Sequence, residues 1–265
     1  MSTLPFYWVD AFTDRPFGGN PAAVVPLERW LPDAELQRLA AQHNLSETAY
    51  FVPEGASRHH LRWFTPAVEV DLCGHATLAT AHILFHERNE PGRRLTFATR
   101  SGPLHVERGE QGMLAMDFPS RPSAPAAGPP ELAAALGAAP VHVGRTDSAW
   151  LCVLASAEQV RALRPDHAAL ARLRPGRFIV TAPGGADGVD FVSRFFAPDA
   201  GIAEDPVTGS AHCVLTPYWA ERLGEPSLHA LQVSARGGEL WCELAGDRVR
   251  IAGRAFTYIK GELRL

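Results

Sequence analysis

An internal duplication constrains the fold of this chain more than any other feature. The pentapeptide Arg-Trp-Phe-Thr-Pro at residues 62–66 returns as Arg-Phe-Phe-Ala-Pro at residues 194–198, an offset of 132 in a chain of 265 residues. Each copy precedes acidic residues, a turn of small residues that includes a glycine, and an apolar helical run, at residues 69–76 and 204–212. Because the same order of sequence features occurs twice, the chain is predicted to form two domains of similar fold.

Composition limits the classes of protein that the chain can represent. A hydrophobic content of 46% supports one large core or two modest cores. The net charge of −4, without a basic run or an acidic tail, predicts no nucleic-acid partner and no anionic membrane partner. The four cysteines show no metal-type spacing, the first residues lack a secretory signal pattern, and no apolar run approaches the ~20 residues that span a bilayer. We therefore expect a cytoplasmic protein with a small-molecule partner and no bound metal.

Local patterns predict the same order of elements in both halves. Strands are expected at residues 7–12, 22–27 and 45–52 and again at 150–154 and 178–181, with helices beginning near residues 33 and 166 and a strongly apolar helix in each half at 76–85 and 214–223. This order favours an α+β fold, in which each domain wraps a curved, mostly antiparallel sheet around a central helix. A dinucleotide-binding fold is disfavoured because no Gly-x-Gly-x-x-Gly follows a strand.

The boundary between the halves is predicted at a proline-rich stretch. Residues 119–130 have the composition of a crossover linker, which separates an N-terminal half at 1–118 from a C-terminal half at 131–265. The last strand of the chain could join either half. We expect the N-terminal half to carry the catalytic base.

Two glycines begin the two apolar helices. Gly74 and Gly209 would leave the first backbone N–H groups of each helix exposed, and two such ends facing one cleft would bind a carboxylate. The alternative is that each glycine only satisfies a positive φ at an ordinary helix cap. Recurrence in both halves, beside His75 in one and Ser210 in the other, favours a site.

Glu47 is the strongest single candidate for catalysis. Period-2 alternation places it on the same strand face as Leu45, Ala49 and Phe51, so a carboxylate points where apolar side chains point. Burial there predicts a raised pKa in the range useful for a general acid or base. If the strand is instead an edge strand, Glu47 is solvated and has no special role.

The remaining polar candidates lie at the two helix starts. His75 could donate to a substrate oxygen, shuttle a proton or cap its own helix, while Asp205 and Ser210 could be site residues or plain caps. A Ser-His-Asp hydrolase built from Ser210, His75 and Asp205 lacks the Gly-x-Ser-x-Gly elbow. His212 is interpreted as structural.

Four blocks of sequence resemble one family. Residues 9–21, 44–48, 72–77 and 204–212 are similar to the signature blocks of the phenazine-biosynthesis isomerase (PhzF-like) family, in the same order and over nearly the whole chain. The resemblance implies the diaminopimelate-epimerase-like fold of two pseudo-symmetric domains, with an acid/base site between them and no cofactor. It also implies a homodimer.

The resemblance assigns a role to each site residue. It implies Glu47 as the proton-transferring acid/base, His75 and Asp205 as assisting groups, and Ser210 as a substrate ligand, together with four further substrate-binding residues: Gly74, Gly209, Asn20 and Cys73. The implied activity is a cofactor-independent isomerisation of a small carboxylated substrate, similar to that of trans-2,3-dihydro-3-hydroxyanthranilate isomerase.

Two alternatives stay open at this point. The superfamily contains racemases and epimerases of amino acids that use two thiols, and this chain has Cys73 at the first thiol position but Thr208 at the second. Cys73 is itself a departure, because phenazine-pathway enzymes have a small residue without a thiol there. The other alternative is a non-catalytic metabolite-binding protein that retains the fold.

Overall fold

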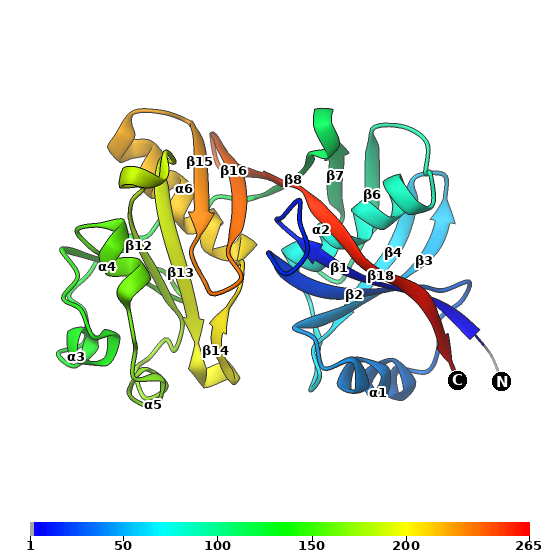
Figure 1. Ribbon diagram of the computed structural model, residues 1–265, viewed down its shortest axis with the longest axis horizontal. Coiled ribbons are helices and arrows are strands. Elements are labelled where there is room, and N and C mark those ends of the chain that lie inside the picture. The colour runs from blue at the N-terminus through cyan, green and yellow to red at the C-terminus, as the bar shows by residue number, and fades with distance from the viewer. Residues whose placement is uncertain (1–2) are drawn as a thin grey trace. The chain divides into compact units, whose positions relative to one another are not determined.

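The computed structural model describes residues 3–265, and the chain divides into two compact units (Figure 1). Unit 1 consists of residues 1–117 and 252–265, and unit 2 of residues 118–251. In the described part of the chain, no helix is both long enough and apolar enough to cross a membrane.

Unit 1 is a strand-rich body built mainly from the N-terminal half. Its helices are α1 (Asp33–His43), α2 (Gly74–His82), the π-helical continuation of α2 (Ile83–Glu87) and a short 3-10 turn (Glu110–Gly112). Its strands are β1 (Thr3–Ala11), β2 (Asn20–Pro26), β3 (Glu47–Gly55), β4 (Arg58–Phe64), β5 (Glu69–Val70), β6 (Arg94–Ala98), β7 (Leu104–Arg108), the beginning of β8 (Leu114–Pro119), and β18 (Ala255–Arg264).

Unit 2 is built from the remaining residues. Its helical segments are α3 (Leu132–Leu136), α4 (Ala157–Ala162), α5 (His167–Leu170), α6 (Gly209–Leu223) and the 3-10 turns Gly185–Asp187 and Pro198–Ala200. Its strands are β9 (Ala124–Pro125), β10 (His142–Arg145), β11 (Trp150–Val153), β12 (Phe178–Pro183), β13 (Phe191–Ala197), β14 (Ile202–Asp205), β15 (Ser227–Gln232), β16 (Gly238–Ala245) and the greater part of β17 (Arg248–Gly253).

The pairing of strands repeats between the units and confirms the predicted pseudo-symmetry. In unit 1, β2 runs parallel to β3, β3 antiparallel to β4, β4 parallel to β6, and β6 antiparallel to β7. Unit 2 repeats these directions: β11 runs parallel to β12, β12 antiparallel to β13, β13 parallel to β15, and β15 antiparallel to β16. With the remaining pairings included, most neighbouring strands within each unit are antiparallel, as the α+β prediction requires.

A buried helix occupies the centre of each unit. All residues of α2 from His75 to Ala81 are buried, and α6 is buried at nine positions from Gly209 to Ala220. α2 packs against β1, β2, β3 and β18, and α6 packs against β15 and β16. Figure 1 shows α2 and α6 beside the strands of their own units. This burial fixes the position of each helix N-terminus.

The repeated pentapeptides form the same contact in both units. In unit 1, Arg62 donates from Nε and Nη2 to the two carboxylate oxygens of Glu69, both at 2.7 Å. In unit 2, Arg194 makes the same two-bond fork with Glu204, again at 2.7 Å for both bonds. Each fork joins the strand of the pentapeptide to the short strand that leads toward the central helix.

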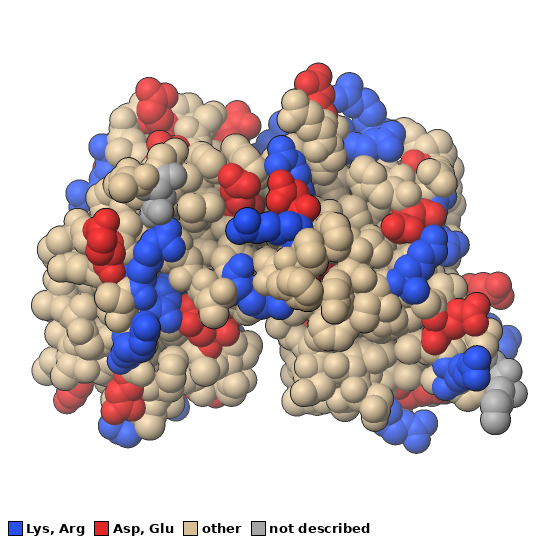
Figure 2. Space-filling view, viewed as in Figure 1, with Lys and Arg blue, Asp and Glu red and all other residues tan. Residues whose placement is uncertain are grey.

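The C-terminal strand returns to the N-terminal body. β18 pairs antiparallel with β1 from Thr3↔Arg264 to Ala11↔Ala255, with a register shift after Trp8. In Figure 1 the red β18 runs beside the blue β1. Within the proline-rich stretch, Ala124 and Pro125 form β9 and pair with β10. On the face drawn in Figure 2, side chains of both charge signs are interspersed.

Candidate active site

Glu47 is the first residue of β3, and its position is fixed by neighbouring backbone. β3 runs parallel to β2, with Glu47 opposite Ala22. Just before β2, Gly19 has φ +63, and a Cβ there would lie 2.1 Å from the carbonyl oxygen of Ala11, so no other residue fits. The next residue, Asn20, is fully buried and accepts a 3.3 Å hydrogen bond from the hydroxyl of Ser46.

The start of α2 supplies the next two groups. Cys73 is the N-cap residue, with extended φ and ψ of −144 and 111, and Gly74 is the first helical residue. Thr77 closes the first turn by donating its hydroxyl to the carbonyl oxygen of Cys73 at 2.6 Å. This hydrogen bond fixes the backbone that carries Cys73 and His75 at the N-terminus of α2.

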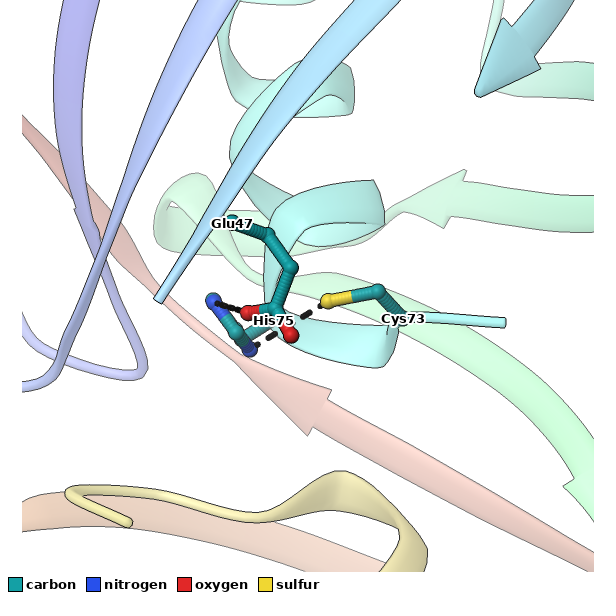
Figure 3. A group of neighbouring side chains, drawn as sticks. All are labelled: Glu47, Cys73 and His75. Carbon is teal, nitrogen blue, oxygen red and sulfur yellow. Dashed lines mark hydrogen bonds and ion pairs between the residues drawn. The ribbon is translucent and has the colours of Figure 1, made fainter. Parts of the chain in front are cut away.

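The three side chains meet in one cluster, Glu47, Cys73 and His75, which Figure 3 shows turned toward one another. His75 Nε2 lies 3.1 Å from Glu47 Oε2, and His75 Nδ1 lies 3.5 Å from Cys73 Sγ. The His75 and Glu47 side chains are 8% and 15% exposed. The contact between His75 Nε2 and Glu47 Oε2 is an ion pair when the imidazole is protonated.

The charge state of the cluster corrects one prediction. Burial raises the pKa of Glu47, but the attraction of His75 and hydrogen bonds from His75 and Cys73 outweigh it and leave the pKa below its usual value. The predicted raised pKa is therefore wrong, because the sequence does not show which way His75 points. Glu47 is a carboxylate at neutral pH.

The two partners of Glu47 take opposite charge states. Burial lowers the pKa of His75, but its contacts with Cys73 and the Glu47 carboxylate raise it well above its usual value. Burial and the Glu47 carboxylate together raise the pKa of Cys73 to about 11. The resting cluster is thus a carboxylate and an imidazolium beside a neutral thiol.

The start of α6 in unit 2 is the counterpart of the start of α2. Thr208 is the N-cap residue with φ −120 and ψ 101, close to the values at Cys73, and Gly209 is again the first helical residue. The hydroxyl of Thr208 donates to Asp205 Oδ2 at 2.5 Å. Ser210 is exposed, so its hydroxyl is free to meet solvent or a ligand. His212, fully buried, contacts the Thr208 carbonyl through Nδ1 at 2.9 Å, as its structural interpretation requires.

Gln232 is a residue of this loop that the sequence analysis missed. It is 1% exposed and accepts a hydrogen bond from the backbone N–H of Thr208 at 2.9 Å. Its amide nitrogen donates to the carbonyl oxygen of Asp205 at 2.8 Å and to the Thr208 hydroxyl at 3.2 Å. The sequence contained a pattern that could have indicated this residue, because alternation in β15 places the polar Gln232 on the same buried face as Leu228 and Ala230.

The predicted site residues therefore fall into two groups. Unit 1 brings together Asn20, Glu47, Cys73, Gly74 and His75, with Ser46 as a further member that the sequence analysis missed. Unit 2 brings together Asp205, Gly209 and Ser210 around Thr208. Within the described residues, the donor atoms of Glu47, Cys73 and His75 also lie within 4.8 Å of one another.

Comparison with known proteins decides the family. The model of the phenazine biosynthesis-like protein family (PhzC-PhzF) matches residues 9–261. The chain belongs to this family. It is 57% identical to an uncharacterized isomerase of Pseudomonas aeruginosa over 99% of both chains. It is 40% identical to the human phenazine biosynthesis-like domain-containing protein, over 98% of this chain and 99% of that one.

Solved structures show the same relationship. A PhzF-family protein of Enterococcus faecalis superposes with a TM-score of 0.96 at 47% identity, with both chains fully covered. A hydroxyproline epimerase of Agrobacterium vitis superposes with a TM-score of 0.59 at 12% identity over 98% of this chain and 92% of that one. The second likeness shows the shared fold alone. The predicted diaminopimelate-epimerase-like fold and the PhzF-like resemblance are confirmed.

Proposed function

We propose that this PhzF-like chain is a cofactor-independent isomerase that moves a proton on a small carboxylated substrate, with Glu47 as the acid/base. The observation that carries the proposal is the Glu47 carboxylate, which is mostly buried and lies 3.1 Å from the His75 imidazole. A buried carboxylate is costly unless it is paired. Relatives that match the whole chain are named isomerases.

The ion pair suits a base that must also return its proton. At rest Glu47 is ionised and can accept a proton from a substrate carbon. Once it is protonated, the neighbouring imidazolium still favours the carboxylate form, so the proton is released readily to a second carbon on the same face. One carboxylate that accepts and delivers in this way performs a 1,3-shift or a tautomerisation.

A two-base racemase is the less favoured reading. Cys73 and Thr208 are equivalent helix N-caps, yet only Cys73 carries a thiol. The Thr208 hydroxyl donates to Asp205, and a hydroxyl is a far weaker base than a thiolate. We propose Asp205 as an assisting group and Ser210 as a substrate ligand, with the N–H groups that begin α2 and α6 suited to a carboxylate.

Deuterium exchange tests the proposal. Purified protein is incubated in deuterated water with a panel of small carboxylated compounds that includes trans-2,3-dihydro-3-hydroxyanthranilate and amino acids, and proton NMR follows isotope incorporation and isomer formation. We expect Glu47→Gln, which keeps the shape but cannot cycle a proton, to lose at least ~10²- to 10⁴-fold in rate. A Glu47→Gln variant that incorporates deuterium at the wild-type rate would contradict the proposal.

Cys73→Ala separates the carboxylate mechanism from the thiol mechanism. The neutral thiol has no counterpart thiol at Thr208, so its removal is expected to reduce the exchange rate far less than Glu47→Gln does. Circular dichroism of both variants checks that each is folded. An inactive Cys73→Ala beside an active Glu47→Gln would make the thiol the base and favour a racemase.

A further inference from the structure

A groove on unit 2 carries charged side chains that belong to neither group of candidate site residues. Its volume is about 980 Å³, and it is lined by residues of two segments, 121–126 and 145–148. These segments meet where β9 pairs antiparallel with the end of β10, with Arg145 opposite Ala124. Pockets for small ligands have volumes of roughly 300 to 1,000 Å³, so the groove is large enough to hold one.

Two arginines give this groove its positive charge. Arg121 lines it from the segment that follows β8, and Arg145 lines it from the last position of β10. Among the residues that the structure describes, neither guanidinium forms an ion pair or a hydrogen bond with another side chain. Arg62 and Arg194, by contrast, are each matched by a glutamate. Guanidinium groups are the usual protein ligands of carboxylates and phosphates, so the groove is suited to an anion.

Contacts with the rest of unit 2 hold both arginines in place. The backbone N–H of Arg121 donates to the carbonyl oxygen of Cys213 in α6 at 2.9 Å. The guanidinium carbon of Arg145 lies 5.0 Å from the ring centre of Trp150. That ring is itself fixed, because its Nε1–H donates to the carbonyl oxygen of Arg174 at 3.2 Å. A site that is organised before its ligand arrives loses less entropy on binding.

The turn between β10 and β11 adds further polar groups to the groove. The N–H of Thr146 donates to the carbonyl oxygen of Ala149 at 2.9 Å, and its hydroxyl accepts from the N–H groups of Ser148 and Ala149 at 3.3 and 3.0 Å. The turn is thus ordered by its own hydrogen bonds, and the Ser148 hydroxyl has no partner in the described part of the chain. Asp147 also lines the groove and opposes an anion, but two guanidiniums outweigh one carboxylate.

We infer that this groove binds a small dianion, a phosphate ester or a dicarboxylate, through Arg121 and Arg145, with the Ser148 hydroxyl as a further donor. Two negative charges match two guanidiniums. The rings of Pro122 and Pro125 also line the groove and offer an apolar surface to the body of the ligand. The inference does not depend on the proton transfer proposed for Glu47, because no residue of that cluster lines the groove.

Amide NMR of the full chain, titrated separately with inorganic phosphate and with succinate, tests the site. We expect saturable shifts within residues 121–126 and 145–148 with at least one of the two anions, and none there with uncharged glycerol. Tighter binding of phosphate would identify the ligand class as a phosphate ester, and tighter binding of succinate as a dicarboxylate. Absence of saturable shifts in both segments with both anions would overturn the inference.

Substitutions show whether the two arginines bind the anion. Arg121→Met and Arg145→Met should each weaken affinity by about 10- to 100-fold, the loss expected for one charge-assisted hydrogen bond. Asp147→Asn should tighten binding, because it removes a like charge. Arg222→Met is the matched control, since this exposed guanidinium also lies over an aromatic ring, 4.6 Å from the centre of Tyr218, but does not line the groove. Wild-type affinity in a folded double variant that lacks both groove arginines would overturn the inference.

Discussion

At the scale of single residues, the contact between Glu47 and His75 sets the chemistry of the candidate site. A carboxylate buried alone would tend to be protonated, whereas this one is ionised because an imidazolium lies 3.1 Å away. Cys73, on the other side of the ring, stays a neutral thiol. The sequence located all three residues, and only the geometry shows that their charge states depend on one another.

The pair should make the free energy of unfolding depend on pH. The pKa of Glu47 is lowered from 4.5, so its contribution is full above pH 4.5 and is lost as pH falls through the folded pKa. The pKa of His75 is raised above 6.5, so its contribution is full below pH 6.5 and is lost as pH rises through the folded pKa. The pair therefore stabilises most between pH 4.5 and 6.5.

Urea unfolding of the wild type and of His75→Asn over a pH series checks this prediction. The stability difference between the two should peak in that window and fall on both sides, at about 1.4 kcal/mol for each unit of pKa shift. Carboxylate NMR of Glu47 should also show its pKa rise in His75→Asn, because burial then acts without the cation. A stability difference that does not change with pH would mean that the two side chains are not ionised together.

At the scale of elements, the repeated Arg–Glu forks hold the strands that precede the two central helices. The Arg62 and Glu69 side chains are 12% and 11% exposed, and those of Arg194 and Glu204 are 10% and 22% exposed. Arg194 also donates from Nη1 to the carbonyl oxygens of Val160 and Leu163. The duplication therefore preserved a contact that joins strands, together with the sequence that makes it.

Removing Arg194 should be costly because it takes the ion-pair partner from the mostly buried Glu204 carboxylate. Arg194→Met is expected to lower the free energy of unfolding by about 3 to 5 kcal/mol. Arg62→Met should cost less, because Arg100 still pairs with Glu69 at 2.6 Å. Arg58→Met is the matched control, because Arg58 and Glu54 form an exposed i,i+4 pair worth at most about 1 kcal/mol. Urea denaturation gives all three values. Equal, small losses would show that the forks contribute no more than surface pairs.

Gln232 should hold the loop that carries Asp205 and Thr208. Gln232→Leu removes the side-chain acceptor of the buried Thr208 N–H and the donor to the Asp205 carbonyl, so a loss of about 1 to 3 kcal/mol is expected for the Thr208 N–H. Ser234→Ala is the control. It removes one hydrogen bond donated to the Pro206 carbonyl and one accepted from the Gly237 N–H, and should cost about 0.5 to 1.5 kcal/mol for each. Urea unfolding and the amide NMR shift of Thr208 report the effect. An unchanged Thr208 amide in Gln232→Leu would contradict the role.

At the scale of the whole molecule, local patterns predicted the elements better than their partners. Alternation placed Glu47 on the strand face of Ala49 and Phe51, although both faces of β3 are buried from Thr48 to Phe51. Repetition predicted the twofold plan, because each copy of the repeated pattern is a short local sequence. The ion pair of Arg194 was not predicted, because its partner Glu204 lies on the next strand. The strand that pairs with β18 was also not predicted, because β1 is more than 240 residues away in the sequence. Contacts between distant segments depend on topology, which single-sequence periodicity does not encode.

The discontinuous composition of unit 1 leads to a prediction about fragments. Residues 118–251 form one continuous segment with its own buried cluster around Leu136, Phe178 and Phe196, so this fragment should fold alone. Residues 1–117 lack β18, which leaves the backbone groups of β1 unpaired along that edge. We expect this second fragment to be unfolded or aggregated.

A circular permutant restores the missing strand in one chain. Thr3 pairs with Arg264, so the start of β1 and the end of β18 are neighbours (Figure 1), and a short Gly-Ser linker from residue 265 to residue 1 would close a β18–β1 hairpin. Residues 252–265 joined in this way to residues 1–117 should unfold cooperatively in urea and give dispersed amide NMR signals, whereas residues 1–117 alone should not. If residues 1–117 prove as stable as the permutant, β18 is dispensable, and the pairing along β1 does not hold unit 1 together.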